Sequence, residues 1–201
     1  PILLNASVAN VAISKIGMLD TASAVELLEI KNKTGQSAIH LAAQCDTFDE
    51  NSVFLKIFKC AATIVIERNP LAILSIQDNN NDTALHLALR SCLLTVGPAV
   101  KELLSLNIEK TTIENFLKLE NCESETIVHV AASKNLSDVL KALLNHKDLD
   151  ACFRLELLQG PAKNGYSALQ MSLKHQELVK FFLVSLSIQD QCKLLSTKFR
   201  D

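Results

Sequence analysis

The chain has 201 residues and a formal net charge of −2, with 48% hydrophobic and 21% charged residues. This composition is typical of a globular protein with a sizeable core and excludes a disordered chain. The 20 Lys and Arg are scattered among the 22 Asp and Glu, so no direct binding of nucleic acid is expected, because phosphate binding needs a clustered basic field. The longest apolar run near the C-terminus, residues 181–188, is far shorter than the roughly 20 residues of a membrane span, and no membrane contact is expected.

Aliphatic side chains carry the apolar content, since Trp is absent and Tyr occurs once. With 5 Gly and 4 Pro, tight turns are too few for an all-β chain, and an all-α fold is predicted. No basic segment followed by an apolar stretch opens the chain, so no secretory signal is expected. The cysteines are widely spaced and form no Cys-x-x-Cys pair: Cys45, Cys60, Cys92, Cys122, Cys152 and Cys192. Free thiols and a cytoplasmic or nuclear location follow as expectations.

A short motif recurs along the chain. It reads GQSAIHLAAQ from Gly35, NDTALHLALR from Asn81, SETIVHVAAS from Ser124 and GYSALQMSLK from Gly165. Its Ser or Thr residues lie 46, 43 and 41 residues apart: Ser37, Thr83, Thr126 and Ser167. A fainter copy, SVANVAISKIG, puts Ser7, Asn10 and Ala12 in the same frame, 30 residues before Ser37.

Each copy predicts a polar turn, a Ser or Thr that caps a first helix, and a second amphipathic helix. Second helices are predicted within residues 52–70, closed by Asn69 and Pro70, and at about 98–106, 138–146 and 176–186. The extra length of the copies is assigned to the second helices and to loops at 71–77, 108–119 and 147–162. Because no single helix pair can bury its apolar stripe, the pairs are expected to stack.

The turn, the T-x-L-H-x-A core and the second helix resemble the ankyrin repeat, whose T-P-L-H-x-A signature sits in units of about 33 residues. The resemblance covers nearly the whole chain, although the family's Pro is replaced by Ala38, Ala84, Ile127 and Ala168 and its turn Gly by Asn81 and Ser124. It implies an all-α, ankyrin-like solenoid of about five stacked helix-turn-helix repeats with long loops. The single domain spans 1–201, with repeats at roughly 5–31, 32–77, 78–120, 121–161 and 162–190 and a cap or tail at 191–201.

His40, His86, His129 and Gln170 occupy one motif position. The resemblance implies a structural role, in which the side chain bonds the backbone of the neighbouring turn. Gln can replace His in such a bond but not as a zinc ligand. No phosphate loop, nucleophile elbow or Cys/His metal spacing is present, so no enzyme activity, cofactor or metal is expected. His146 to Asp150 are interpreted as a solvated loop, and Cys45 and Cys122 as exposed, unreactive thiols.

The concave face of an ankyrin-like stack binds proteins, so the resemblance implies a protein partner there. The family's variable positions, carried over copy by copy, predict these contact residues: Lys33, Thr34, Gln36, Gln44, Asn79, Asn80, Asp82, Arg90, Glu123, Glu125, Ser133, Lys134, Lys163, Asn164, Tyr166, Lys174 and His175. Tyr166 and Arg90 are expected to bind the partner without supporting the fold, because they are assigned to exposed positions.

Residues 27–43 and 165–183 also resemble the IκB group, the ankyrin inhibitors and co-regulators of Rel/NF-κB transcription factors, which show a similar LDI…GQ(S/T) entry and GYS…Q opening. This implies binding and regulation of a Rel-type transcription factor or signalling protein. A generic ankyrin scaffold or targeting domain, from a multidomain protein or a bacterial effector, is the alternative. A non-catalytic part of an enzyme, or a redox protein using its cysteines, is the third reading.

Overall fold

The structure is a computed structural model that describes residue 15 and residues 18–45, 53–64, 71–91, 96–106 and 108–185. Within these residues the regular structure is helical, apart from two isolated β-bridges, Gln77 with Thr83 and Pro161 with Ser167. The predicted all-α class is therefore confirmed. No helix in the described ranges is long and apolar enough to cross a membrane.

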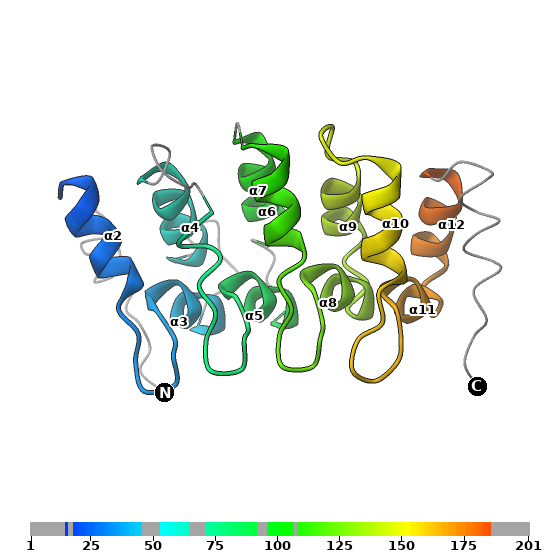
Figure 1. The fold of residues 1–201 in the computed structure, drawn as a ribbon, viewed down its shortest axis with the longest axis horizontal. Helices are drawn as coiled ribbons and strands as arrows, with labels where there is room; N and C mark the ends of the chain where they lie inside the picture. Colours follow the sequence, from blue (N-terminus) through cyan, green and yellow to red (C-terminus); the bar gives the residue numbers. More distant parts are fainter. Residues whose placement is uncertain are drawn as a thin grey trace.

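Four short helices form an inner row, which runs along the lower part of Figure 1. They are the helices that the recurring motif predicts: α3 (Ala38–Cys45), α5 (Ala84–Arg90), α8 (Ile127–Ser133) and α11 (Ala168–Ser172). Each contacts the next along the row. The small residue two positions after the motif His or Gln is buried in every copy: Ala42, Ala88, Ala131 and Ser172. Small side chains let neighbouring helices pack closely, which explains their recurrence.

Four helices of 8 to 12 residues form an outer row above the inner one (Figure 1). They are α4 (Val53–Ile64), α6 (Val96–Ser105), α9 (Ser137–Leu144) and α12 (Gln176–Ser185). Each packs on the inner helix that precedes it and on the next member of its own row. The apolar stripe predicted for α4 is buried, including Phe54, Phe58 and Ala61. Pro98 lies in the first turn of α6, where a missing N–H costs no helical hydrogen bond.

Three further helices stand with the outer row: α2 (Thr21–Glu29), α7 (Lys110–Leu117) and α10 (Ala151–Gln159). The predicted loops at 108–119 and 147–162 are therefore wrong, because α7 and α10 fill most of them. In α10 the buried residues Phe153, Leu155, Leu157 and Leu158 alternate more like a strand than a helix. The helix contacts both α8 and α11, so it buries more than one face and shows no helical stripe in the sequence. The predicted loop at 71–77 is present as a single turn, with the Ser75 amide donating to the Leu71 carbonyl at 2.8 Å.

One apolar cluster runs through the described helices from Leu28 in α2 to Phe182 in α12. It joins every unit to its neighbours, which fits the expectation that no helix pair buries its stripe alone. Several predicted features lie outside the described residues: the faint first copy at Ser7, Asn10 and Ala12, the closing Asn69 and Pro70, and the tail at 191–201.

Candidate functional site

Four six-residue turns precede the inner helices and lie along the lower edge of the molecule (Figure 1). We call them turn 1 (residues 32–37), turn 2 (78–83), turn 3 (121–126) and turn 4 (162–167). The fourth residue of each has a positive φ: Gly35 76°, Asn81 58°, Ser124 54° and Gly165 83°. Left-handed backbone favours Gly and Asn, so Ser124 is the least usual occupant. A side chain at Gly35 would also collide with Asn79, whose Oδ1 would lie 2.3 Å from the added Cβ.

The first residue of three turns fixes the loop with its own side chain. In turn 2, Asp78 Oδ1 accepts from the amides of Asn80 at 2.8 Å and Asp82 at 3.0 Å. Asn32 and Asn121 make the same pair of bonds in turns 1 and 3. Turn 4 has Ala162 there, and Asn164 Oδ1 accepts from the Tyr166 amide instead, at 3.0 Å. The recurrence of Asx five residues before the capping Ser or Thr is a signal that the sequence analysis missed.

Successive turns are hydrogen-bonded to one another through their backbones. The second residue of each later turn donates to the third residue of the turn before it. The pairs are Asn79 N to Thr34 O at 3.1 Å, Cys122 N to Asn80 O at 2.8 Å and Lys163 N to Glu123 O at 2.8 Å. The turns therefore form one continuous edge, and the side chains at their second and third positions are held in a fixed register.

The three motif histidines bond the next turn or the backbone just before it. In the third copy, counting the faint one at Ser7 as the first, His86 Nδ1 lies 2.8 Å from Thr83 Oγ1 and accepts from the Thr83 amide at 3.2 Å, while its Nε2 lies 3.1 Å from the Glu125 carbonyl. A backbone amide can only donate, so Nδ1 is unprotonated and Nε2 carries the proton. His40 bonds the Asp82 carbonyl at 3.1 Å and His129 the Gly160 carbonyl at 2.8 Å in the same way.

The bonds of His40 and His86 to the neighbouring turn are the ones predicted, whereas His129 bonds Gly160, two residues before turn 4. Burial lowers the pKa of His86 from 6.5 to about 4, against the opposing effect of the nearby Asp82 carboxylate. Burial also lowers the pKa of His40 and of His129. All three rings are therefore neutral at pH 7, as their hydrogen bonds require.

Gln170 takes the histidine position in the last copy. Its Oε1 accepts from the Ser167 amide at 2.9 Å, and its own amide donates to Ser167 Oγ at 3.2 Å. This repeats the cap made by the histidines. Among the described residues, the Gln170 Nε2 group has no following turn to bond, so the series of turn-to-turn side-chain bonds ends here.

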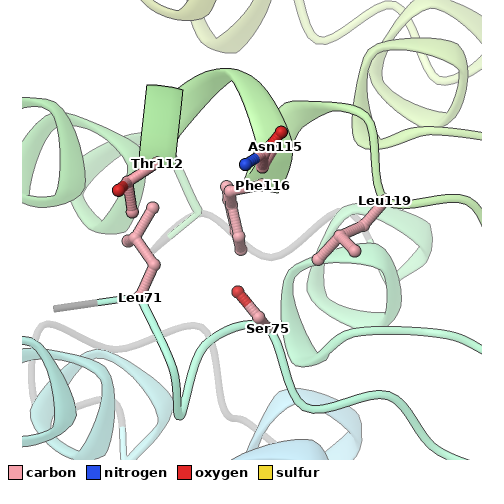
Figure 2. Close-up of a pocket in the computed structure, with 6 residues that line it drawn as sticks. All are labelled: Leu71, Ser75, Thr112, Asn115, Phe116 and Leu119. Carbon is pink, nitrogen blue, oxygen red and sulfur yellow. The ribbon is translucent and has the colours of Figure 1, made fainter. Parts of the chain in front are cut away.

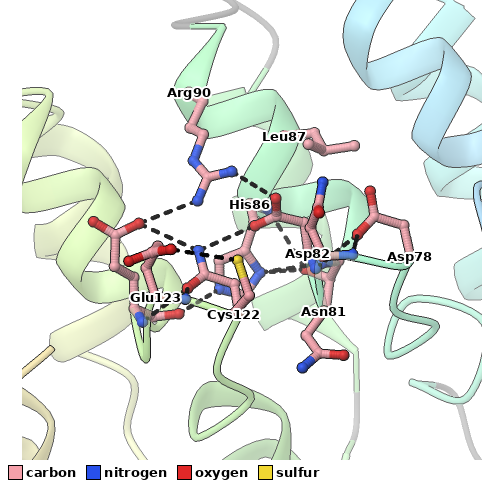
Figure 3. A network of polar contacts seen from close by, with 12 residues as sticks. Asp78, Asn81, Asp82, His86, Leu87, Arg90, Cys122 and Glu123 are labelled. Atoms are coloured by element: carbon pink, nitrogen blue, oxygen red, sulfur yellow. Dashed lines mark hydrogen bonds and ion pairs between the residues drawn. The ribbon is translucent and has the colours of Figure 1, made fainter. Parts of the chain in front are cut away.

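A polar network joins turn 2, α5 and turn 3 (Figure 3). Arg90 binds Asp82 Oδ2 at 2.5 Å and Glu125 Oε2 at 3.1 Å. Asn121 Nδ2 donates to Asp82 Oδ1 at 3.1 Å and to Glu125 Oε2 at 3.2 Å. The network pairs the charge of Arg90 with two carboxylates and locks turn 2 to turn 3.

This network corrects the predicted roles of two contact residues. Asp82 is 1% exposed, so the prediction that it projects toward a partner is wrong. Arg90 is partly exposed but neutralises the buried Asp82 carboxylate, so the expectation that it does not support the fold is also wrong. A single repeat does not reveal this, because the residue that covers Asp82 is Asn121, from the next turn.

The other predicted contact residues remain accessible to different degrees. Gln36, Glu125 and His175 are half-buried. The remaining ones are exposed: Lys33, Thr34, Gln44, Asn79, Asn80, Glu123, Ser133, Lys134, Lys163, Asn164, Tyr166 and Lys174. Most of them lie on the turn tips or at the ends of inner helices, along the edge that the backbone bonds hold in register.

One hollow gathers several of these residues. The cavity, of about 420 Å³, lies between the fourth and fifth copies of the motif, with Glu125 and Ser133 on one side and Tyr166, Met171 and Lys174 on the other. Asn164 and Gln170 also line it. We call it the Tyr166 pocket. Met171, a lining residue that was not among the predicted contact residues, is half-buried.

A second cavity, of about 150 Å³, lies between α7 and the turn at 71–75. In Figure 2, Thr112, Asn115 and Phe116 of α7 face Leu71 and Ser75, with Leu119 at one side. None of these six side chains ionises near neutral pH, so this cavity offers no acid, base or charged anchor.

The cysteines and His146, which could take part in catalysis or metal binding, do not form a common site in the described part of the chain. Cys122 and Cys152 are exposed free thiols, and burial raises the pKa of the partly buried Cys60 thiol; Cys92, Cys192 and the side chain of Cys45 lie outside the description. His146 is 8% exposed, so its interpretation as part of a solvated loop is wrong: it packs at the end of α9. In the described ranges no three His, Cys, Asp or Glu side chains are grouped to hold a metal ion.

A comparison with models of protein families finds none that matches the chain, and a comparison with curated protein sequences finds no match.

Proposed function

We propose that this chain is an ankyrin-like solenoid that binds another protein along its turn tips and inner helices. The main support is a contrast between the buried and the exposed positions of the motif copies. The buried motif positions repeat from copy to copy, whereas the exposed second and third residues of the turns differ each time: Lys33 and Thr34, Asn79 and Asn80, Cys122 and Glu123, Lys163 and Asn164. A rigid edge with varied side chains is suited to recognising a specific protein surface.

The resemblance of residues 27–43 and 165–183 to the IκB group makes a Rel-type transcription-factor dimer the first partner to test. Binding would then restrain or redirect that factor, in the cytoplasm or the nucleus. The exposed free thiols of Cys122 and Cys152 support a reducing compartment. The generic scaffold or targeting domain remains the alternative, and it differs in partner but not in the binding edge. The absence of enzyme activity stays a prediction.

The proposed binding edge, made by the four turns, is tested with a triple substitution of exposed turn residues, Asn80→Arg, Glu123→Arg and Lys163→Glu. We call this protein the tip variant. These side chains are exposed and make no ion pair among the described residues, so a melting curve should hardly change. The control, Lys101→Glu with Lys147→Glu, changes exposed charges away from the turns. Calorimetric titration with a Rel dimer, and quantitative capture of partners from cells, should show at least tenfold weaker binding for the tip variant only. Loss of binding in the control alone would contradict the proposed edge.

A further inference from the structure

We propose that the Tyr166 pocket binds a peptide segment of the partner in which a bulky apolar side chain stands beside Asp or Glu. This inference rests on the proposed function and names the chemistry that one part of the binding edge recognises. Its support comes from the shape of the pocket, its apolar wall, its unmatched positive charge and its unused hydrogen-bonding groups.

The pocket has the size and wall to hold an apolar side chain. Its volume of about 420 Å³ falls in the range of pockets that take small ligands or side chains. The Tyr166 ring is 56% exposed and is the one aromatic side chain that is exposed in the described part of the chain. Met171 lines the same side of the pocket and is half-buried against the core. A rigid ring and an adaptable thioether are side chains that proteins use to grip apolar anchors.

The charge around the pocket is positive by count. The lysines Lys134, Lys163 and Lys174 outweigh the exposed Glu123 and the one negative charge that remains when Arg90 is shared by Asp82 and Glu125. Glu125 is already bound by Arg90 at 3.1 Å and by Asn121 at 3.2 Å. Lys174 lines the pocket, is exposed and has no ion pair among the described residues. Lys134 and Lys163 directly follow or precede the lining residues Ser133 and Asn164, and they too have no partner carboxylate in that part of the chain.

Three lysines of the outer row and its extra helices do have a carboxylate partner. Lys59 pairs with Glu102 at 3.6 Å, Lys110 with Asp150 at 2.8 Å and Lys118 with Glu156 at 2.7 Å. Each of these carboxylates belongs to the next helix pair or the next extra helix along the stack. The lysines around the Tyr166 pocket offer a positive field that an incoming carboxylate can complete. Within the four turns, Glu123 is the one exposed acidic residue.

The pocket also lies where the turn-to-turn hydrogen bonds stop. In the three earlier copies the histidine Nε2 group donates to a backbone carbonyl further along the chain. Gln170 holds the same place and lines the pocket, but its Nε2 group meets no such carbonyl in the described residues. A carbonyl of an extended peptide laid across the pocket would satisfy this donor, as the following turn does elsewhere.

The test uses the full chain and a phage-displayed library of random 12-residue peptides, followed by anisotropy titration with a fluorescent peptide of the selected consensus. We expect a consensus with one aromatic or large aliphatic residue and an Asp or Glu within three positions. Tyr166→Ala and Lys174→Glu should each weaken its binding at least tenfold, and added salt should weaken it further. The matched control, Lys101→Glu, carries the same charge change on α6 and should bind within twofold of the parent chain.

A selection that enriches no peptide, or a consensus without a carboxylate, overturns the inference. Unchanged binding by Lys174→Glu overturns it as well, provided that circular dichroism shows the variant to be folded. The protein partner identified in the experiment on the tip variant distinguishes the failure of this inference from the failure of the proposed function. If that partner still binds Tyr166→Ala and Lys174→Glu normally but loses affinity for the tip variant, the pocket inference fails while the binding edge stands.

Discussion

At the scale of single residues, His86 shows how a side chain with catalytic potential is used for architecture. Replacing it with Ala removes the acceptor of the buried Thr83 amide and the donor to the part-buried Glu125 carbonyl. A net hydrogen bond contributes about 0.5–1.5 kcal/mol, and each orphaned group costs about 1–3 kcal/mol. We expect His86→Ala to lower the free energy of unfolding by about 2–4 kcal/mol in urea denaturation.

The conservative control at this position is His86→Gln. Gln170 already makes the same cap in the fifth copy, so an amide at position 86 should retain most of the stability. If His86→Ala and His86→Gln lowered the free energy of unfolding equally, the packing of the ring, and not its hydrogen bonds, would account for the stability.

At the scale of secondary-structure elements, the extra helices α7 and α10 distinguish this chain from a simple succession of helix pairs. Leu158 of α10 is 1% exposed and belongs to the main apolar cluster. Large-to-small substitutions in a core typically cost about 2–5 kcal/mol, so Leu158→Ala should lower the free energy of unfolding by that amount. A residue in a solvated loop would show almost no effect.

Cys152, six residues earlier in the same helix, is exposed and provides the control. Cys152→Ala should change the free energy of unfolding by no more than about 0.5 kcal/mol. Chemical denaturation of the two variants therefore decides whether α10 is part of the core or a dispensable connection.

At the scale of the whole molecule, the buried histidines make stability depend on pH. The pKa of His86 falls from 6.5 to about 4 on folding because of burial. Between these values the unfolded chain binds more protons than the folded one, so the free energy of unfolding decreases as the pH is lowered. The contribution is complete above about pH 6.5 and is lost as the pH approaches 4, amounting to about 3 kcal/mol at most for His86.

His40 and His129 act in the same direction, since burial lowers the pKa of both. Urea midpoints measured at pH 7.5, 6.0 and 4.5 should fall stepwise for the parent chain. His86→Gln should show a shallower decrease, because an amide does not titrate. A gap between the two proteins that stays constant over this pH range would contradict the assignment.

Much of the local structure follows from the sequence because it depends on contacts within one copy of the motif. Ser37, Thr83, Thr126 and Ser167 cap helices through neighbours three residues away, and the apolar stripe of α4 follows helical periodicity. The histidine position could be assigned from its recurrence in three copies. These features depend on residues a few positions apart, so the sequence alone is enough to predict them.

Only the tertiary structure decided the features that depend on neighbouring copies. Asp82 is buried because Asn121 and Arg90 cover it from turn 3 and α5, although by position it is an exposed turn residue. The stripe of α10 is invisible in the sequence because the helix is enclosed on more than one side. The Tyr166 pocket likewise combines Glu125 and Ser133 of one copy with Tyr166 and Met171 of the next. Burial and charge pairing across an interface are properties of the stack, and no single repeat contains them.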